Sequence, residues 1–300
     1  MIRKFLNGIL FGNYFYGFCA VALCIEASLQ QRYPVSEPIF LLLVFLLTIW
    51  YYTLAYQTDM TMTTSPNPRT RWYVQHKRWI QIMEWICMMA SMLILGLMLY
   101  RYGHLISGIR FRQWILIFIV PLAAGGYYGI QLIPGFNLRR IGWLKPFVIG
   151  FTWAGFTTIY PVLYYHITHQ SPDLLGPYGW WLFLKNFMFV SVLCIMFDIK
   201  DYASDSNQNI KTFVVAKGLK YTLFNILIPL TIIGLMSFII FSLLNHFALL
   251  RIAFNMLPFV ALLLVAYALQ RRQSIFFYLF VIDGLMLFKA ICGSLGALFT

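Results

Sequence analysis

Long apolar runs, each about the length needed to cross a lipid bilayer, dominate this sequence. A membrane-spanning helix needs about 20 consecutive, mostly apolar residues. Nine runs meet this requirement, at 10–30, 36–58, 78–100, 113–133, 144–168, 178–198, 221–244, 248–269 and 274–299. Only 10% of the residues are charged, against about a quarter in a soluble domain. The sequence therefore predicts an all-α integral membrane protein in which nine transmembrane helices form one domain over residues 1–300.

The basic residues lie mostly in the short gaps between these runs. If the amino terminus is inside the cell, 15 Lys and Arg residues fall on the inner side and 5 on the outer side. Inner loops carry the excess of positive charge, so this orientation places the amino terminus and the polar inner loops in the cytoplasm, at the inner membrane. The net charge of +13 is spread over loops, which argues against a nucleic-acid partner. Glu26, near an outer helix end, is expected to face water.

An acidic stretch follows the sixth apolar run. Asp198, Asp201 and Asp205 are spaced i, i+3 and i+7, so a helix continuing through them would place all three on one face. Carboxylates are ligands that Mg²⁺ prefers, usually together with phosphate oxygens of a substrate. Lys200, Lys211 and the backbone near Thr212 are candidates to bind that phosphate. The alternative is a helix end whose charges face water.

A second polar loop on the inner side follows the second run. It contains Asp59, a candidate metal ligand, and Arg69 and Arg71, candidates for a phosphate clamp. A single aspartate in a Thr-rich loop is also ordinary, so both interpretations stand. Lys145 lies at the start of the fifth run, shortly after Arg139 and Arg140. Its side chain either reaches the same site or marks the membrane interface.

Polar residues inside apolar runs are further candidates, because such residues usually face a bundle interior. Asn13 and Asp283 are candidates to line a substrate pocket; Asp283 has Lys289 or a helix hydroxyl as alternative partners. The cysteines and histidines have no metal-binding spacing, which argues against zinc or haem. Prolines inside the predicted helices are expected to kink them without ending them; these are Pro121, Pro161, Pro229 and Pro258.

The acidic stretch, its Lys211-Thr212 pair and Gly218 together resemble the second aspartate-rich motif of the UbiA superfamily of membrane prenyltransferases. The count of helices and the two polar loops are also similar to that family. The resemblance implies Mg²⁺ and an isoprenyl diphosphate held by the loops, and transfer of the isoprenyl group to a small aromatic or lipid-pathway acceptor in the membrane. By this resemblance the metal ligands are Asp59, Asp198, Asp201 and Asp205; the diphosphate ligands are Arg69, Arg71, Lys145, Lys200, Lys211 and Thr212; and the catalytic residues are Asp198, Asp201 and Lys145.

The first aspartate-rich motif departs from the family pattern, since Asp59 stands alone and Gln57 lies near the position expected for asparagine. This departure motivates one alternative, a catalytically impaired relative that binds a lipid or a partner protein. A second alternative is a secondary transporter with ion sites at Glu84, Asp198 and Asp283.

Overall fold

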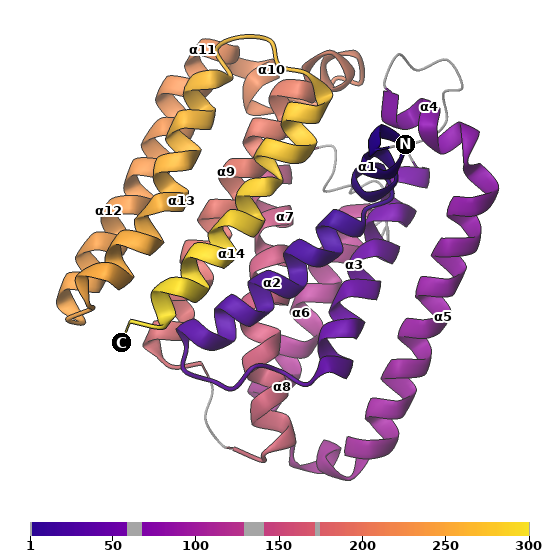
Figure 1. Cartoon of the computed structure of the whole chain (residues 1–300), viewed down its shortest axis with the longest axis vertical. Helices are drawn as coiled ribbons and strands as arrows, with labels where there is room; N and C mark the ends of the chain where they lie inside the picture. Colours follow the sequence, from indigo (N-terminus) through magenta and orange to yellow (C-terminus); the bar gives the residue numbers. More distant parts are fainter. Residues whose placement is uncertain (1, 59–67, 129–140, 172–174, 300) are drawn as a thin grey trace. The chain divides into compact units, whose positions relative to one another are not determined.

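The computed structural model of the chain describes residues 2–58, 68–128, 141–171 and 175–299, and all regular structure in these ranges is helical (Figure 1). The elements are α1 (Ile2–Phe11), α2 (Tyr14–Gln30), α3 (Pro38–Thr58), α4 (Pro68–Gln75), α5 (Lys77–Tyr102), η1 (Gly103–Gly108), α6 (Phe111–Tyr128), α7 (Lys145–Ala154), η3 (Gly155–Ile159), α8 (Tyr160–Thr168), α9 (Pro177–Asn207), α10 (Phe213–Lys217), α11 (Leu219–Thr222), η4 (Leu223–Leu227), α12 (Ile228–Leu244), α13 (Leu249–Ala268), η5 (Phe277–Ile282) and α14 (Gly284–Ala297).

The helices form two compact units. Unit 1 consists of Met1–Ala22 and Ser36–Gly108, and unit 2 of Leu23–Val35 and Ile109–Thr300. Unit 1 therefore holds α1, α3, α4, α5, η1 and the first part of α2, whereas unit 2 holds the end of α2 and everything from α6 onward.

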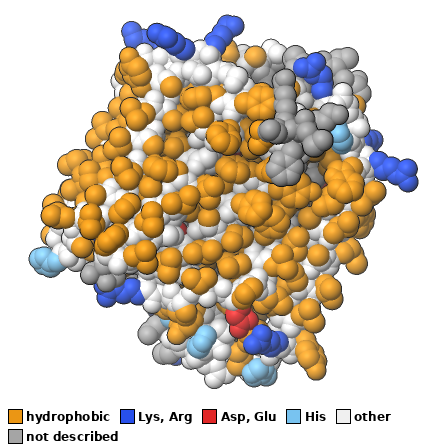
Figure 2. All heavy atoms as spheres, viewed as in Figure 1, with side chains coloured by type: hydrophobic (Ala, Val, Ile, Leu, Met, Phe, Trp, Pro, Cys, Tyr) orange, Lys and Arg blue, Asp and Glu red, His pale blue; other side chains and the backbone are white. Residues whose placement is uncertain are grey.

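Within the described residues, seven helical segments are long and apolar enough to cross a membrane. They are Pro38–Gln57, Lys77–Gly108, Lys145–Thr168, Pro177–Asn207, Leu219–Leu244, Leu249–Ala268 and Phe277–Ala297. At the other two predicted positions lie shorter apolar helices, Tyr14–Gln30 and Phe111–Tyr127. Hydrophobic side chains cover most of the visible surface in Figure 2, as expected where lipid tails replace water. The prediction of an all-α, multi-pass membrane protein is thus confirmed.

Wider helical turns precede two of the prolines. The π-helical segment η3 lies just before Pro161, and the π-helical segment η4 lies just before Pro229. Proline has no N–H group, so the carbonyl four residues earlier loses its usual donor and the local winding changes. Both segments continue as single candidate spans, and Pro121 and Pro258 lie inside uninterrupted helices. The prediction that none of these prolines ends its helix is confirmed.

In unit 2, α7 packs along α9. The two helices are in close contact at Gly150, where an added Cβ atom would lie 2.3 Å from the Ser191 Oγ and 2.9 Å from the Phe187 carbonyl oxygen. Only glycine permits this approach. The helices run antiparallel, so the beginning of α7, at Lys145, lies beside the end of α9, where the acidic residues are.

Candidate functional site

The site in unit 2 is built around an ion-pair cluster between α7 and α9. Lys145 Nζ lies 2.9 Å from Asp198 Oδ1 and 3.8 Å from Asp205 Oδ2. The Asp198 side chain is fully buried, and the Lys145 side chain is 20% exposed. One cation is therefore shared by two carboxylates at the end of α9. The Lys145 side chain thus reaches the acidic residues, which was one of the two expectations for it.

The length of α9 explains how these carboxylates meet. The helix was predicted to end near residue 198, but it continues to Asn207, because the polar residues after Asp198 still fit the helical geometry. Asp198 and Asp205, seven residues apart, lie on one face of this extension. Asp201 departs from that expectation: it is partly exposed and ion-paired with Lys200 at 2.8 Å. It remains within electrostatic range of Lys145.

The segment after α9 folds back against the start of α7. Thr212 is fully buried and caps α10, its hydroxyl accepting a hydrogen bond from the Val215 N–H at 3.4 Å. Lys211 is exposed. A Cβ atom added at Gly142 would lie 2.4 Å from the Lys211 carbonyl carbon and 2.5 Å from the Thr212 nitrogen. The absence of a side chain at Gly142 thus lets the Lys211-Thr212 backbone lie directly beside the turn that leads into Lys145.

Substitution Gly142→Ala is expected to push these two segments apart, because the atoms in its way belong to the backbone. We expect a loss of about 1–3 kcal/mol in the free energy of unfolding, as for other overpacked positions. Thermal unfolding of the purified protein in detergent measures it. The matched control is Gly176→Ala, where nothing lies within 4 Å of an added Cβ. Equal effects of the two substitutions would contradict the close approach.

Two carboxylates at the end of α9, of Asp198 and Asp205, are the candidate ligands for a divalent cation. Asp198 Oδ2 is buried and has no hydrogen-bond partner, and an oxygen from Asp198 and one from Asp205 already converge on a single positive group. Among the residues that the structure describes, no three His, Cys, Asp or Glu side chains are close enough to hold a metal by themselves. Mg²⁺ commonly takes one or two carboxylates and completes its coordination with water and substrate phosphates.

Asp283 lies in the same unit, at the junction of η5 and α14. It is buried and close enough to act electrostatically on Cys194, one turn before Asp198. Its predicted alternative partner, Lys289, is ion-paired with Glu26 instead. Asp283 thus belongs to the surroundings of the acidic site.

Asn13 and Arg69 form a second polar cluster, in unit 1. Asn13 is fully buried and donates to Thr53 Oγ1 and to the Tyr73 hydroxyl, both at 3.0 Å, and its carbonyl oxygen accepts from Arg69. The Arg69 guanidinium also lies 4.4 Å from the centre of the Tyr56 ring. Burial raises the pKa of the Tyr73 hydroxyl, and Arg69 only partly opposes this, so Tyr73 remains a neutral phenol.

Asn13 also corrects one predicted helix. The run at 10–30 was expected to be one helix, but α1 ends at Phe11 and α2 begins at Tyr14. Asn13 has a φ of 66°, a left-handed conformation that asparagine tolerates better than most residues. The chain turns there and the Asn13 side chain enters the polar cluster.

The remaining candidates of the first polar loop are only partly placed. Asp59 lies outside the described residues. Arg139 and Arg140, which precede the fifth run, also lie outside them. Arg71 is exposed. Gln57 donates a short hydrogen bond to Glu84, which ties α3 to α5 within unit 1. The structure thus holds Arg69 in a buried cluster and leaves Arg71 at the surface.

Comparison of the chain with protein-family models, with curated proteins and with solved structures finds no match in any of the three. The chemistry of the site must therefore be argued from its own residues.

The pairing of Glu26 with Lys289 was not predicted from the sequence. Glu26 was expected to face water, but its side chain is fully buried and ion-paired with Lys289 at 2.9 Å. The physical reason is the neighbouring helix: α14 brings a lysine to the inward face of α2, where a carboxylate can neutralise it. A lysine in the middle of an apolar run was the available signal, because such a residue needs a buried partner.

Proposed function

We propose that this chain is a Mg²⁺-dependent prenyltransferase of the UbiA superfamily, with nine transmembrane helices, in the cytoplasmic membrane. It would transfer the isoprenyl group of an isoprenyl diphosphate to a small acceptor, either aromatic or from lipid metabolism. The observation that carries the proposal is the cluster of Lys145, Asp198 and Asp205. Two buried carboxylates converge there on one cation, beside the Lys211-Thr212 segment that the family motif contains.

In this proposal Asp198, Asp201 and Asp205 would hold Mg²⁺. The metal, when bound, would neutralise negative charge on the diphosphate leaving group. Lys145, Lys200, Lys211 and Thr212 would contact the diphosphate.

Lys145 has the best-defined part in this scheme. Its ammonium group holds the Asp198 and Asp205 carboxylates in place, and its partial exposure leaves N–H donors for a phosphate oxygen. Asn13 would fix the direction of Arg69 by accepting its hydrogen bond. Asp283 would line the acceptor side of the pocket. The amino terminus and both polar loops would face the cytoplasm.

Substitution Asp198→Asn tests the proposal. It keeps the shape of the side chain and removes the charge, so we expect Mg²⁺-dependent release of pyrophosphate from allylic diphosphates to fall at least about 100-fold, as when a group that stabilises charge in the transition state is removed. The measurement is pyrophosphate release by purified protein, with mass spectrometry of the prenylated product. Asp201→Asn is expected to act in the same direction.

The control is Glu37→Gln, which removes a carboxylate from an exposed pair with Arg101 and is expected to leave turnover unchanged. Equal turnover by the wild type and by Asp198→Asn would contradict the assignment. Wild-type protein that binds lipid but releases no pyrophosphate would favour the impaired relative. Flux of a solute across liposomes without any covalent product would favour the transporter.

A further inference from the structure

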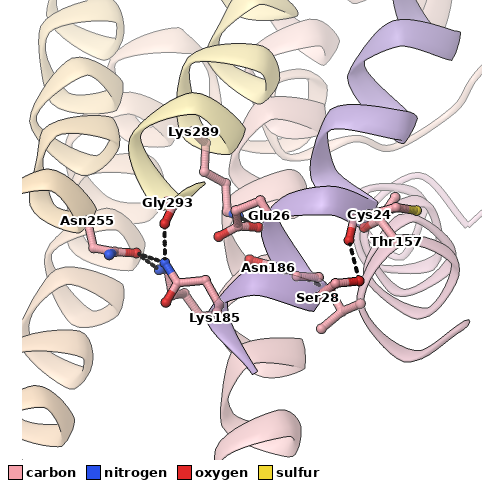
Figure 3. A network of polar contacts seen from close by, with 12 residues as sticks. Cys24, Glu26, Ser28, Thr157, Lys185, Asn186, Asn255, Lys289 and Gly293 are labelled. Carbon is pink, nitrogen blue, oxygen red and sulfur yellow. Dashed lines mark hydrogen bonds and ion pairs between the residues drawn. The ribbon is translucent and has the colours of Figure 1, made fainter. Parts of the chain in front are cut away.

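A second buried network of charged and polar residues joins four helices of unit 2, away from the residues assigned above. Figure 3 shows Glu26 of α2, Lys185 of α9, Asn255 of α13 and Lys289 of α14 pointing toward one another. Lys289 Nζ lies 2.9 Å from Glu26 Oε2, and Lys185 Nζ donates to Asn255 Oδ1 at 2.7 Å. All four side chains are buried. Lys185 is 13 residues before Asp198, which is about 20 Å along α9 at 1.5 Å per residue.

Arg251, at the start of α13, extends this network. Its Nη2 donates to the backbone oxygen of Gln30 at 3.1 Å, to Gln30 Oε1 at 3.2 Å and to the Tyr178 hydroxyl at 3.2 Å. The Gln30 side chain in turn donates to Asn255 Oδ1 at 3.0 Å. Arg251 and Lys185 are therefore linked through two neutral amides, and no carboxylate lies between them.

The charges of this network do not balance. Among the described residues it contains three basic side chains, Lys185, Lys289 and Arg251, and one carboxylate, Glu26. Aromatic rings relieve part of the cost: Lys185 lies 4.8 Å from the centre of the Phe238 ring. Cation–π contacts of this kind contribute far less than the cost of burying a cation without a counter-charge.

One donor of the network is also left over. Arg251 is 4% exposed, and its Nε has no hydrogen-bond partner. A buried guanidinium with an unused N–H, linked to Lys185 through two amides, offers donors of the kind that bind phosphate oxygens. Basic pockets between transmembrane helices bind phosphate-bearing lipid head groups in the same way.

We propose that this network binds a phosphate group, which contacts Arg251 and Lys185 and supplies negative charge to a cluster whose basic side chains outnumber its carboxylates. The phosphate is carried by an anionic lipid or is free inorganic phosphate. This site is separate from the proposed diphosphate site at the end of α9, so either assignment can hold without the other.

Thermal unfolding of the purified full-length protein in detergent tests the proposal, with phosphatidic acid, phosphatidylcholine or inorganic phosphate added in parallel. We expect phosphatidic acid to raise the midpoint of unfolding by roughly 5 °C relative to phosphatidylcholine, the size of shift that saturating binding produces. An equal rise with inorganic phosphate would identify free phosphate as the source. No rise with either probe would overturn the proposal.

Substitution Lys185→Met removes one cation while keeping the length of the side chain. The Asn255 oxygen still accepts from Gln30, so the variant retains a satisfied amide. We expect the stabilisation to disappear in Lys185→Met and to persist in the control Lys220→Met, which changes an exposed lysine of the same unit. Full stabilisation of Lys185→Met would contradict the site.

Native mass spectrometry of the wild-type protein provides a measurement that does not depend on the folding of any variant. Protein released from micelles that contain equal amounts of phosphatidic acid and phosphatidylcholine should retain one molecule of phosphatidic acid preferentially. Equal retention of the two lipids, together with no shift by inorganic phosphate, would overturn the proposal.

Discussion

Substitution Lys145→Met is expected to lower the free energy of unfolding by about 3–5 kcal/mol, the usual cost of removing one partner from a buried ion pair. Asp198 is fully buried and lies 2.9 Å from the Lys145 ammonium group, and Asp205 shares the same cation at 3.8 Å. Without Lys145 the two carboxylates repel each other in a poorly solvated position. Chemical or thermal unfolding of the purified protein in detergent, without added divalent cations, measures the loss.

The control for this prediction is a second lysine–aspartate pair, in which both residues lie on α9. Lys200 and Asp201 lie 2.8 Å apart, but their side chains are 23% and 36% exposed. Exposed pairs contribute about 0–1 kcal/mol, so Lys200→Met should have little effect on stability. The double variant Lys145→Met with Asp198→Asn should recover part of the loss, because the buried charge has been removed as well. Similar losses for Lys145→Met and Lys200→Met would contradict the central place of Lys145 in the cluster.

The same variant separates a metal site from a purely structural ion pair. If Mg²⁺ binds Asp198 and Asp205 as proposed, it competes with Lys145 for these oxygens. Mg²⁺ should therefore stabilise Lys145→Met more than it stabilises the wild type, and a chelator should reverse the gain. A structural ion pair without metal affinity predicts no difference between the two proteins in Mg²⁺.

The membrane-spanning class of the fold follows from the sequence because it depends only on local composition. Apolar runs of about 20 residues leave few alternatives to a helix in lipid, and the described helices occupy the predicted runs. The exact ends were less predictable. Apolar content stops near Asp198, whereas the helix continues to Asn207, since polar residues also support helical hydrogen bonds. The turn at Gly12-Asn13 was missed because an apolar run conceals a short interruption.

The partners inside the bundle could not be predicted, because they depend on which helices are neighbours and on how they are rotated. The spacing of Asp198 and Asp205 indicated a shared face, but Lys145 reaches them only because α7 packs closely on α9 at Gly150. The position of Glu26 near the end of an apolar run likewise predicted a solvated side chain. Its partner Lys289 is 263 residues away along the chain, so no local pattern contained the pair.

The pair of Glu26 and Lys289 provides the second large expected effect. Glu26→Gln removes the one carboxylate of a described network that contains three basic side chains and leaves Lys289 without its partner, so we expect a loss of about 3–5 kcal/mol in the free energy of unfolding. The control is Glu37→Gln, which breaks an exposed pair with Arg101 and should cost no more than about 1 kcal/mol. The measurement is unfolding of the two variants and the wild type under identical detergent conditions.

Substitution of the other partner, Lys289, distinguishes a charge-balanced pair from a network with excess positive charge. Lys289→Met leaves Glu26 within electrostatic range of Lys185, so the carboxylate keeps a positive neighbour and the total charge of the cluster falls. We therefore expect Lys289→Met to destabilise the protein less than Glu26→Gln. The double variant should lose less than the sum of the two single losses, which a double-mutant cycle measures directly. If Lys289→Met were as damaging as Glu26→Gln, the pair would be an isolated salt bridge, and the excess of positive charge would have no energetic consequence.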